Sequence, residues 1–184
     1  MKTKEEQDQA RAKSQAEAQL SSIREMVAAL DRETAAKAYA DALDIEKVKA
    51  LLDEHIGTAI HANLPEDEAR ELLADKINEE SIEPGDFEFN QEDAQQAIQE
   101  DALSVEVRSG WESSPDELKP QEYAILLCTG GPACRIIGSL GEYGDPESAS
   151  IQYQDWFTPW VDYPLDREEE ADVVKYAQQF YFGQ

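Results

Sequence analysis

The hydrophobic pattern of the chain changes its period near residue 102. Before that point apolar residues recur at intervals of three and four, the spacing of one helix face. Leu20, Ile23, Val27 and Leu30 form the first such stripe, and the residues around them are strong helix formers. Similar stripes predict further helices over residues 34–43, from Ile45 to Ile60, and over residues 66–78 and 91–101.

Polar residues mark where several of these helices begin. Asp44 stands directly before the stripe that starts at Ile45, so it is an expected N-cap. Pro65 falls at the start of helix 66–78, a position that tolerates proline. Asn90, followed by Asp93, gives helix 91–101 a capping arrangement of the same kind. The first half of the chain is therefore expected to be helical.

From Leu103 onward, apolar and polar residues alternate, which is typical of strands. We expect strands over residues 103–108, 123–129, 135–140 and 150–157, separated by turns rich in glycine and proline. These connections are too short for a parallel crossover, so the strands should form an antiparallel meander. Asp166 followed by Glu169 predicts a capped final helix over residues 166–181, which Gly183 would stop.

Helices followed by strands and one closing helix indicate an α+β fold. Residues 1–101 are expected to form a helical region, and residues 102–184 an antiparallel sheet with the C-terminal helix. Residues 1–15 lack an apolar stripe and are expected to fray. The chain has neither a run of roughly 20 apolar residues nor an apolar signal-peptide core, so we expect a cytoplasmic protein.

The chain is strongly and unevenly acidic. Its 184 residues include 41 acidic and 16 basic side chains, a formal charge of −25. Residues 53–106 hold 17 of the acids and only two bases, Arg70 and Lys76. Such a surface repels phosphate backbones and anionic lipid, and it attracts cations or basic protein surfaces. Direct binding of nucleic acid or of a membrane is therefore disfavoured.

Between Lys76 and Arg108 there are ten acidic residues and no basic one. Duplex DNA carries one negative charge per roughly 1.7 Å of its axis, and carboxylates at a comparable density could enter a groove built for phosphates. Carboxylates also accept paired hydrogen bonds from arginine. The alternatives are that the acids serve solubility, or adaptation to high salt. The predicted partner-binding acids of this block are Glu79, Glu80, Glu83, Asp86, Glu88, Glu92, Asp93, Glu100 and Asp101.

Aromatic residues gather between Tyr153 and Tyr163. One interpretation places them in the core against the last helix, where large aromatic rings bury much surface. The other exposes Trp156 or Trp160, flanked by Asp155 and Asp162, as anchors for a basic partner. Asp155, Trp156 and Trp160 therefore complete the predicted partner-binding set.

The sequence predicts no catalytic, cofactor-binding or metal-ligating residue. Residues 86–97 begin like a calcium loop, but Gln91 stands where that loop needs glycine and Ala97 where it needs glutamate. Cys128 and Cys134 flank a Gly-Gly-Pro turn, so they should face each other on paired strands as thiols or as a reversible disulfide. Without two further ligands they do not make a zinc site.

In its size, acidity, mixed α/β pattern and lack of a catalytic motif, the chain resembles the acidic anti-restriction and anti-CRISPR proteins of phages and mobile elements. Residues 122–138, with the segments Gln-Asp-Trp at 154–156 and Thr-Pro-Trp at 158–160, also resemble a phage or plasmid accessory protein. Several such anti-defence proteins mimic nucleic acid. The resemblance implies inhibition by mimicry and assigns no individual residue.

We therefore expect a non-enzymatic inhibitor without a cofactor. It would bind the basic nucleic-acid-binding surface of a host defence protein, such as a CRISPR effector or a restriction enzyme, by mimicking DNA or RNA charge. One alternative is an oligomeric structural or adaptor protein, in which the helix over residues 16–30 forms a homodimer. The other is an enzyme with a site in the C-terminal sheet around Cys128, Arg135 and Trp156.

Overall fold

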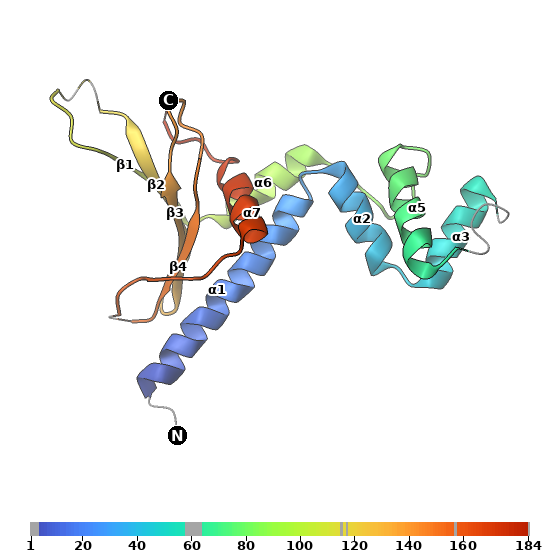
Figure 1. The fold of residues 1–184 in the computed structure, drawn as a ribbon, viewed down its shortest axis with the longest axis horizontal. Coiled ribbons are helices and arrows are strands. Elements are labelled where there is room, and N and C mark those ends of the chain that lie inside the picture. The colour runs from blue at the N-terminus through green and yellow to red at the C-terminus, as the bar shows by residue number, and fades with distance from the viewer. Residues whose placement is uncertain (1–3, 58–63, 115, 117, 157, 184) are drawn as a thin grey trace. The chain divides into compact units, whose positions relative to one another are not determined.

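The computed structural model describes residues 4–57, 64–114, 116, 118–156 and 158–183, and it has the predicted α+β architecture (Figure 1). Helices come first, a five-stranded antiparallel sheet follows, and a helix closes the chain. Two expected positions, Ile60 and the end of the strand at residue 157, lie outside the described residues. Among the described residues, none of the helices is both long and apolar enough to cross a lipid bilayer.

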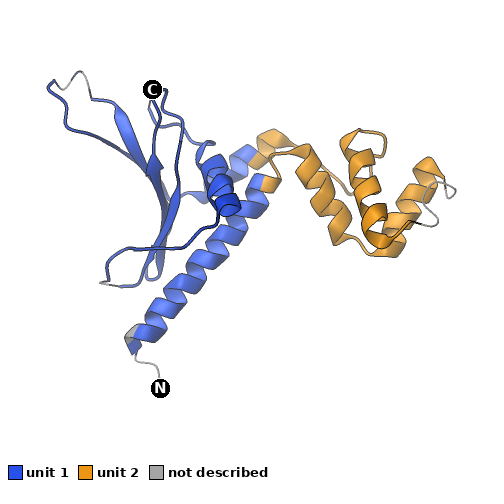
Figure 2. Ribbon diagram, in the orientation of Figure 1, with its two compact units in different colours: residues 1–27, 95–184 blue, residues 28–94 orange. Residues whose placement is uncertain are grey.

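The chain divides into two compact units, which Figure 2 shows in different colours. Unit 1 consists of residues 1–27 and 95–184, and unit 2 of residues 28–94. The predicted regions, 1–101 and 102–184, follow secondary structure alone. The units instead group the first helix of the chain with the sheet, because its apolar face is buried there.

The sheet of unit 1 is the predicted meander, with strand order β1-β2-β3-β4-β5. All neighbouring strands pair in the antiparallel sense, as the short turns require. The strand bounds differ from the prediction by a few residues: the second strand begins at Pro120, the third begins at Ala133 and the fourth ends at Gln154. The two-residue fifth strand is not part of the prediction. The strands are β1 (Ser104–Ser109), β2 (Pro120–Cys128), β3 (Ala133–Ser139), β4 (Ser150–Gln154) and β5 (Val161–Asp162).

One face of this sheet is covered by α1 (Lys4–Ala28) and α7 (Arg167–Ala177), which lie on the same side of it (Figure 2). Alternate residues of the central strands, such as Ile125, Ile136 and Ile151, are fully buried. Their neighbours in sequence point to the other face of the sheet, because side chains alternate along a strand. The sheet therefore has one covered face and one open face.

The expectation that residues 1–15 fray is wrong for residues 4–15, which belong to α1. Ala12 and Ala16 are fully buried, on the same helix face as Leu20 and Ile23. Small alanine side chains carry little hydrophobic signal, but they let a helix approach a sheet closely. The apolar stripe thus begins earlier than the large residues alone indicate.

The described residues of unit 2 include three whole helices, α2 (Arg32–Ala42), α3 (Ile45–Ile56) and α5 (Glu66–Asn78). Its core is built from small and branched apolar side chains, with Val48, Leu52, Leu73 and Ile77 fully buried. The Asp44 carboxylate caps α3, as predicted, by accepting a hydrogen bond of 2.8 Å from the Lys47 backbone. The bounds of α5 match the predicted helix 66–78.

The helix α6 (Gln91–Asp101) also has its predicted bounds, and its first turn is capped by the Asn90 side chain. The final helix begins with the predicted capping box of Asp166 and Glu169. It ends at Ala177, four residues earlier than expected, and Phe182 beyond it is buried with its ring 4.8 Å from that of Tyr123. Because the helix ends at Ala177, the residues that follow can turn toward the sheet and place Phe182 in the core.

Candidate functional site

The acidic residues of the middle third are divided between the two units. Seven of the nine predicted contacts, from Glu79 to Asp93, lie in unit 2. Glu100 and Asp101 lie in unit 1. Unit 2 alone holds 19 acidic and six basic residues, a formal charge of −13. The candidate site is therefore built from the seven acids of unit 2.

The cations of unit 2 are largely neutralised inside the unit. Lys76 pairs with Glu79 at 2.6 Å, and Arg32 approaches Glu80 at 3.9 Å. Arg70 pairs with Glu66 at 2.7 Å. These contacts leave few cations to balance the acids elsewhere on the unit. They also engage Glu79 and Glu80, two of the predicted contacts, with partners from the same unit.

Four of the seven acids remain available, and we call them the four exposed carboxylates: Glu83, Glu88, Glu92 and Asp93. All four residues are exposed. No ion pair or side-chain hydrogen bond joins their carboxylates to any residue that the structure describes. These acids fall within eleven residues of sequence, and they are the members of the predicted set in unit 2 that can offer charge to another molecule.

The segment that carries Glu83 and Glu88 is held in place by its apolar neighbours. Ile82 and Pro84 are buried. The Arg32 guanidinium lies 5.8 Å from the ring centroids of both Phe87 and Phe89, a distance suited to cation–π attraction. The residues on either side of Glu83 and of Glu88 are buried or half-buried, and both glutamates are exposed.

Asp86 has a structural role in the same segment. Its carboxylate accepts hydrogen bonds from the Tyr39 hydroxyl and the Lys47 ammonium, each at 2.5 Å. It thereby ties the segment to α2 and α3. The hydrogen bonds from Lys47 and Tyr39 hold the pKa of Asp86 below its usual range, and burial raises the pKa of Tyr39 to about 12. Tyr39 therefore remains a donor at neutral pH.

Replacing Asp86 with asparagine should lower the melting temperature most near pH 7. A carboxylate whose pKa is depressed by folding stabilises the protein above its unfolded pKa of about 4, and this stabilisation is lost as the pH falls through the folded pKa. The difference between wild type and Asp86→Asn should therefore shrink below about pH 4. Thermal unfolding at a series of pH values measures it, and a difference that stays constant down to pH 3 would contradict the assignment.

The remaining two acids of the block belong to the C-terminal half of α6 in unit 1. Glu100 is exposed and accepts a hydrogen bond of 2.7 Å from Gln96. Asp101 accepts a hydrogen bond of 2.7 Å from the hydroxyl of Tyr176, a fully buried residue of α7. Asp101 thus helps to hold α6 against α7, and its carboxylate is committed to this contact.

Asp155 does not present its charge at the surface. The residue is only 5% exposed, and its carboxylate lies 3.4 Å from the Arg11 guanidinium of α1. A buried carboxylate paired within the chain cannot act as a surface anchor without moving. The prediction that Asp155 contacts a partner directly is therefore corrected: the register of β4 turns this position toward the covered face of the sheet.

The two predicted tryptophan anchors lie in different surroundings. Trp156 is 60% exposed, and its indole stands against the turn at Gly131, where a β-carbon would lie 1.9 Å from the indole nitrogen. Trp160 is half-buried, and the Arg135 guanidinium lies over its ring at 4.2 Å from the centroid. Trp156 remains accessible as a contact, whereas one face of Trp160 is already occupied.

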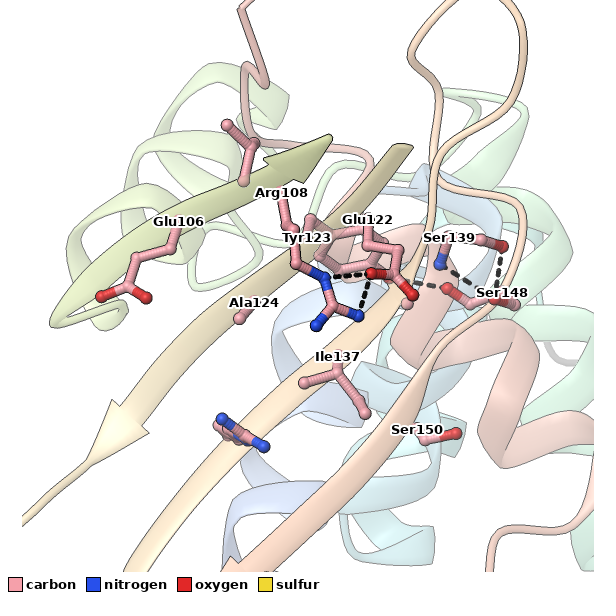
Figure 3. Close-up of a pocket in the computed structure, with 12 residues that line it drawn as sticks. Glu106, Arg108, Glu122, Tyr123, Ala124, Ile137, Ser139, Ser148 and Ser150 are labelled. Carbon is pink, nitrogen blue, oxygen red and sulfur yellow. Dashed lines mark hydrogen bonds and ion pairs between the residues drawn. The ribbon is translucent and has the colours of Figure 1, made fainter. Parts of the chain in front are cut away.

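The open face of the sheet contains a shallow groove of about 470 Å³ that sequence reasoning did not identify (Figure 3). Ala124 and Ile137 lie on its floor, and Ser139 and Ser150 line one side. Arg108 and Glu122 form an ion pair across β1 and β2. The alternation within residues 104–108 and within residues 135–139 indicates which side chains of each strand share a face. It does not indicate that the two strands contribute to one groove.

Arg135 is the cation most constrained in this groove. Its Nε and Nη2 atoms donate to Oε1 of Gln152 at 3.0 and 2.8 Å, while its plane lies over Trp160. Burial lowers the pKa of Arg135, and the nearby Glu106 carboxylate opposes that shift. The Arg135 side chain is thus fixed by Gln152 of β4 and by Trp160, which follows β4 in the sequence. The groove offers the guanidinium groups of Arg108 and Arg135 together with several hydroxyls.

Cys128 and Cys134 face each other across the β2–β3 turn, as the sequence predicts. Both are free thiols. Burial raises the pKa of Cys134 to about 12 and also raises the pKa of Cys128. Burial therefore disfavours the reactive thiolate form of both residues.

A search for metal-binding groups and comparisons with known proteins give no further information on the candidate site. Within the described ranges, no three His, Cys, Asp or Glu side chains are grouped so that they could hold a metal ion. Comparison of the chain with protein families, with characterised proteins and with solved structures finds no match. The candidate site rests on its own geometry and charge.

Proposed function

We propose that the protein is an inhibitor that uses the acidic surface of unit 2 to occupy the basic nucleic-acid-binding groove of another protein. The resemblance noted in the sequence favours a host defence protein as that partner, such as a CRISPR effector or a restriction enzyme. The four exposed carboxylates would take the place of phosphates opposite lysine and arginine side chains of the partner. The chain would act without a cofactor and without chemistry of its own.

The observation that carries this proposal is the separation of charges within unit 2. Arg70 is engaged by an acid of its own helix, Lys76 by the acid directly after that helix, and Lys47 by Asp86. The four exposed carboxylates, in contrast, have no cationic partner among the described residues. Acids that served only to balance internal cations would be paired, so the unpaired ones leave net negative charge for an external cation.

The proposal uses fewer direct contacts than the sequence predicts, because several of the predicted acids are engaged within the chain. Glu79, Glu80 and Asp86 are engaged within unit 2, and Asp101 is bonded to Tyr176. These acids contribute to the field around the chain, which steers a basic partner over a distance of about 8–10 Å at physiological salt. Direct contacts are assigned to the four exposed carboxylates.

The two alternative functions have less support. The stripe of Leu20, Ile23 and Val27, which would form a homodimer through the helix of residues 16–30, is buried within unit 1. An enzyme centred on Cys128 would need a lowered thiol pKa, whereas burial raises it. Binding through charge uses features that the folded chain leaves exposed.

Reversing the charge of the four exposed carboxylates tests the proposal. The variant Glu83→Lys, Glu88→Lys, Glu92→Lys, Asp93→Lys is compared with wild type in DNA-cleavage assays on purified restriction enzymes and guide-loaded CRISPR effectors. An exposed ion pair contributes about 0.2–1 kcal/mol, so the loss of four should weaken inhibition by roughly 10-fold or more. Inhibition by the wild-type chain should also weaken as salt is raised.

A matched control separates the site from net charge. Glu25, Glu142, Asp145 and Glu170 are exposed acids of unit 1, and changing them to lysine alters the charge by the same amount. This control variant should inhibit nearly as well as wild type. Equal loss in both variants would assign the effect to overall charge, and no loss in either, or a partner that holds DNA and this chain together, would contradict the proposal.

A further inference from the structure

The edge strand β1 leaves one side of the sheet unpaired. β1 has a strand neighbour on one side only, β2, in the described sheet. Backbone N–H and C=O groups on the outer side of an edge strand are a template for pairing with another strand. Proteins usually protect such an edge with a short strand, a proline or several charges. β1 has six residues, Ser104–Ser109, with no proline and one charge of each sign.

The apolar face of β1 is also uncovered. Val105 and Val107 stand opposite Ile125 and Tyr123 of β2, so they lie on the face of the sheet that α1 and α7 cover. Ile125 and Tyr123 are buried, whereas Val105 is 38% and Val107 is 48% exposed. Leu103, two residues earlier, is 58% exposed. The sheet therefore extends one strand beyond its helices and ends in an alternating row of exposed apolar side chains.

The charges on the opposite face of β1 are self-complementary. Glu106 and Arg108 lie on either side of Val107 and point to the open face of the sheet, where both line the groove (Figure 3). In an antiparallel pair of identical strands centred on Val107, Glu106 of each copy stands directly opposite Arg108 of the other. Opposite charges in this position stabilise an antiparallel pair, by roughly 0.2–1 kcal/mol each.

The neighbouring register is less favourable. Centring the pair on Glu106 would keep the apolar face on the correct side, but it would place Glu106 opposite Glu106 of the other copy. Like charges directly opposite each other are destabilising. Shifting the pairing by a single residue would place the valines of one copy on the same face of the joined sheet as the charged residues of the other. Such a register is disfavoured, because side chains alternate between the two faces along a strand. The register centred on Val107 is therefore the one that the side chains favour.

From this geometry we infer that two copies of the chain associate through antiparallel pairing of their β1 strands. The sheets would join into one, with Val107 packed on Val107 of the other copy. Arg108, which pairs with Glu122 of its own chain, would gain Glu106 of the other copy as a second carboxylate partner, which gives two such contacts across the junction. The same register brings Trp111, which is fully exposed, toward Leu103 of the other copy. The inference does not depend on the proposed function, because none of the four exposed carboxylates takes part.

The contact is small, so a weak dimer is expected. Stable interfaces usually bury at least about 1,000 Å² in total, and a pair of six-residue strands with a few flanking apolar side chains lies near that limit. We therefore expect a dissociation constant in the micromolar range. Each chain has a charge of −25, so association is measured at about 0.15 M salt, where the Debye length is about 8 Å.

Charge exchange within β1 tests the pairing with the full chain. In Glu106→Arg alone, arginine would meet arginine across the junction, and in Arg108→Glu alone, glutamate would meet glutamate. Each single variant should dimerise at least about 10-fold more weakly than wild type. A 1:1 mixture of the two restores opposite charges at both positions, and heterodimers should form with nearly wild-type affinity. Analytical ultracentrifugation over a concentration series measures all three samples.

A control and a folding check complete the test. Glu142→Arg changes an exposed acid of the same unit, away from β1, and should dimerise like wild type. Circular dichroism and thermal unfolding confirm that each variant is folded. Two results would overturn the inference: a wild-type chain that stays monomeric at several hundred micromolar, far above the expected dissociation constant, or single variants whose dimerisation is unchanged and unaffected by mixing.

Discussion

Gly138→Ala is expected to lower the free energy of unfolding by about 3 kcal/mol, one of the two largest effects that the structure predicts for a single substitution. Gly138 lies in β3 opposite Tyr123 of β2. A β-carbon at this position would lie 1.9 Å from the backbone oxygen of Ser148 and 2.6 Å from the Tyr123 ring. Neither neighbour is the free end of a flexible side chain, so the strand pairing itself must shift.

The substitution would also disturb a hydrogen bond at the same place. The Tyr123 hydroxyl donates to the Ser148 carbonyl at 2.8 Å, and this ring packs on Phe182. Overpacking of a core typically costs 1–3 kcal/mol, and loss of a hydrogen bond in a buried site adds about 1 kcal/mol. Urea unfolding measures the sum. Gly85→Ala is the matched control, because no atom lies within 4 Å of its added β-carbon, and equal stability of the two variants would contradict the prediction.

Most of the fold could be predicted because its signals are local. The caps at Asp44 and Asp166 and the bounds of α5 and α6 depend on residues within a few positions of each other. The meander depends only on alternation and on short turns. What failed was also local in origin: the buried Ala12 and Ala16 give almost no hydrophobic signal, so residues 4–15 were expected to fray.

The candidate site could be predicted only in part, because charge counting along the chain ignores pairing in space. Asp86 meets Tyr39 and Lys47, which are 47 and 39 positions away. Asp155 meets Arg11 across 144 positions. Such pairs depend on how the helices and strands pack, so a local sequence pattern does not predict them. Glu83 and Glu88 are exposed, but charge counting alone does not distinguish them from the engaged Asp86.

The division of the acidic block has the same cause. The chain begins in unit 1 with α1, forms unit 2, and returns to unit 1 near residue 95. A helix that continues without interruption, α6, carries Glu92 and Asp93 in its first turn and Asp101 at its end. Sequence proximity therefore did not imply a common compact unit, and the structure describes seven of the nine predicted acids together, within unit 2.

Replacing Arg70 with methionine is expected to lower the stability of the chain by about 3 kcal/mol, the second large effect. Nη1 of Arg70 donates to the carbonyl oxygens of Ala40 at 2.7 Å and Leu43 at 2.6 Å, at the end of α2. These are the carbonyl groups that a helix end leaves without partners. Nη2 of the same side chain pairs with Glu66 at 2.7 Å. One guanidinium thus joins α5 to the end of α2.

Arg70→Lys should recover only part of this loss, because an ammonium group cannot reproduce the planar fork of donors. Lys37→Met, which removes an exposed cation of α2, is the control for charge and should change stability by less than about 0.5 kcal/mol. Urea unfolding compares the variants, and amide exchange at the last turn of α2 should quicken only when Arg70 is changed. Equal stability of Arg70→Met and Lys37→Met would refute the capping role.

The same pair of variants tests whether the proposed inhibition depends on the net charge of unit 2 or on carboxylates held in a fixed arrangement. Arg70→Met and Lys37→Met each make unit 2 more negative by one. If inhibition depended on net charge alone, both would inhibit slightly better than wild type. If it depends on carboxylates held in a fixed arrangement, only Lys37→Met should improve, and Arg70→Met should lose inhibition as the temperature approaches its lowered melting point. Cleavage assays at two temperatures distinguish these outcomes.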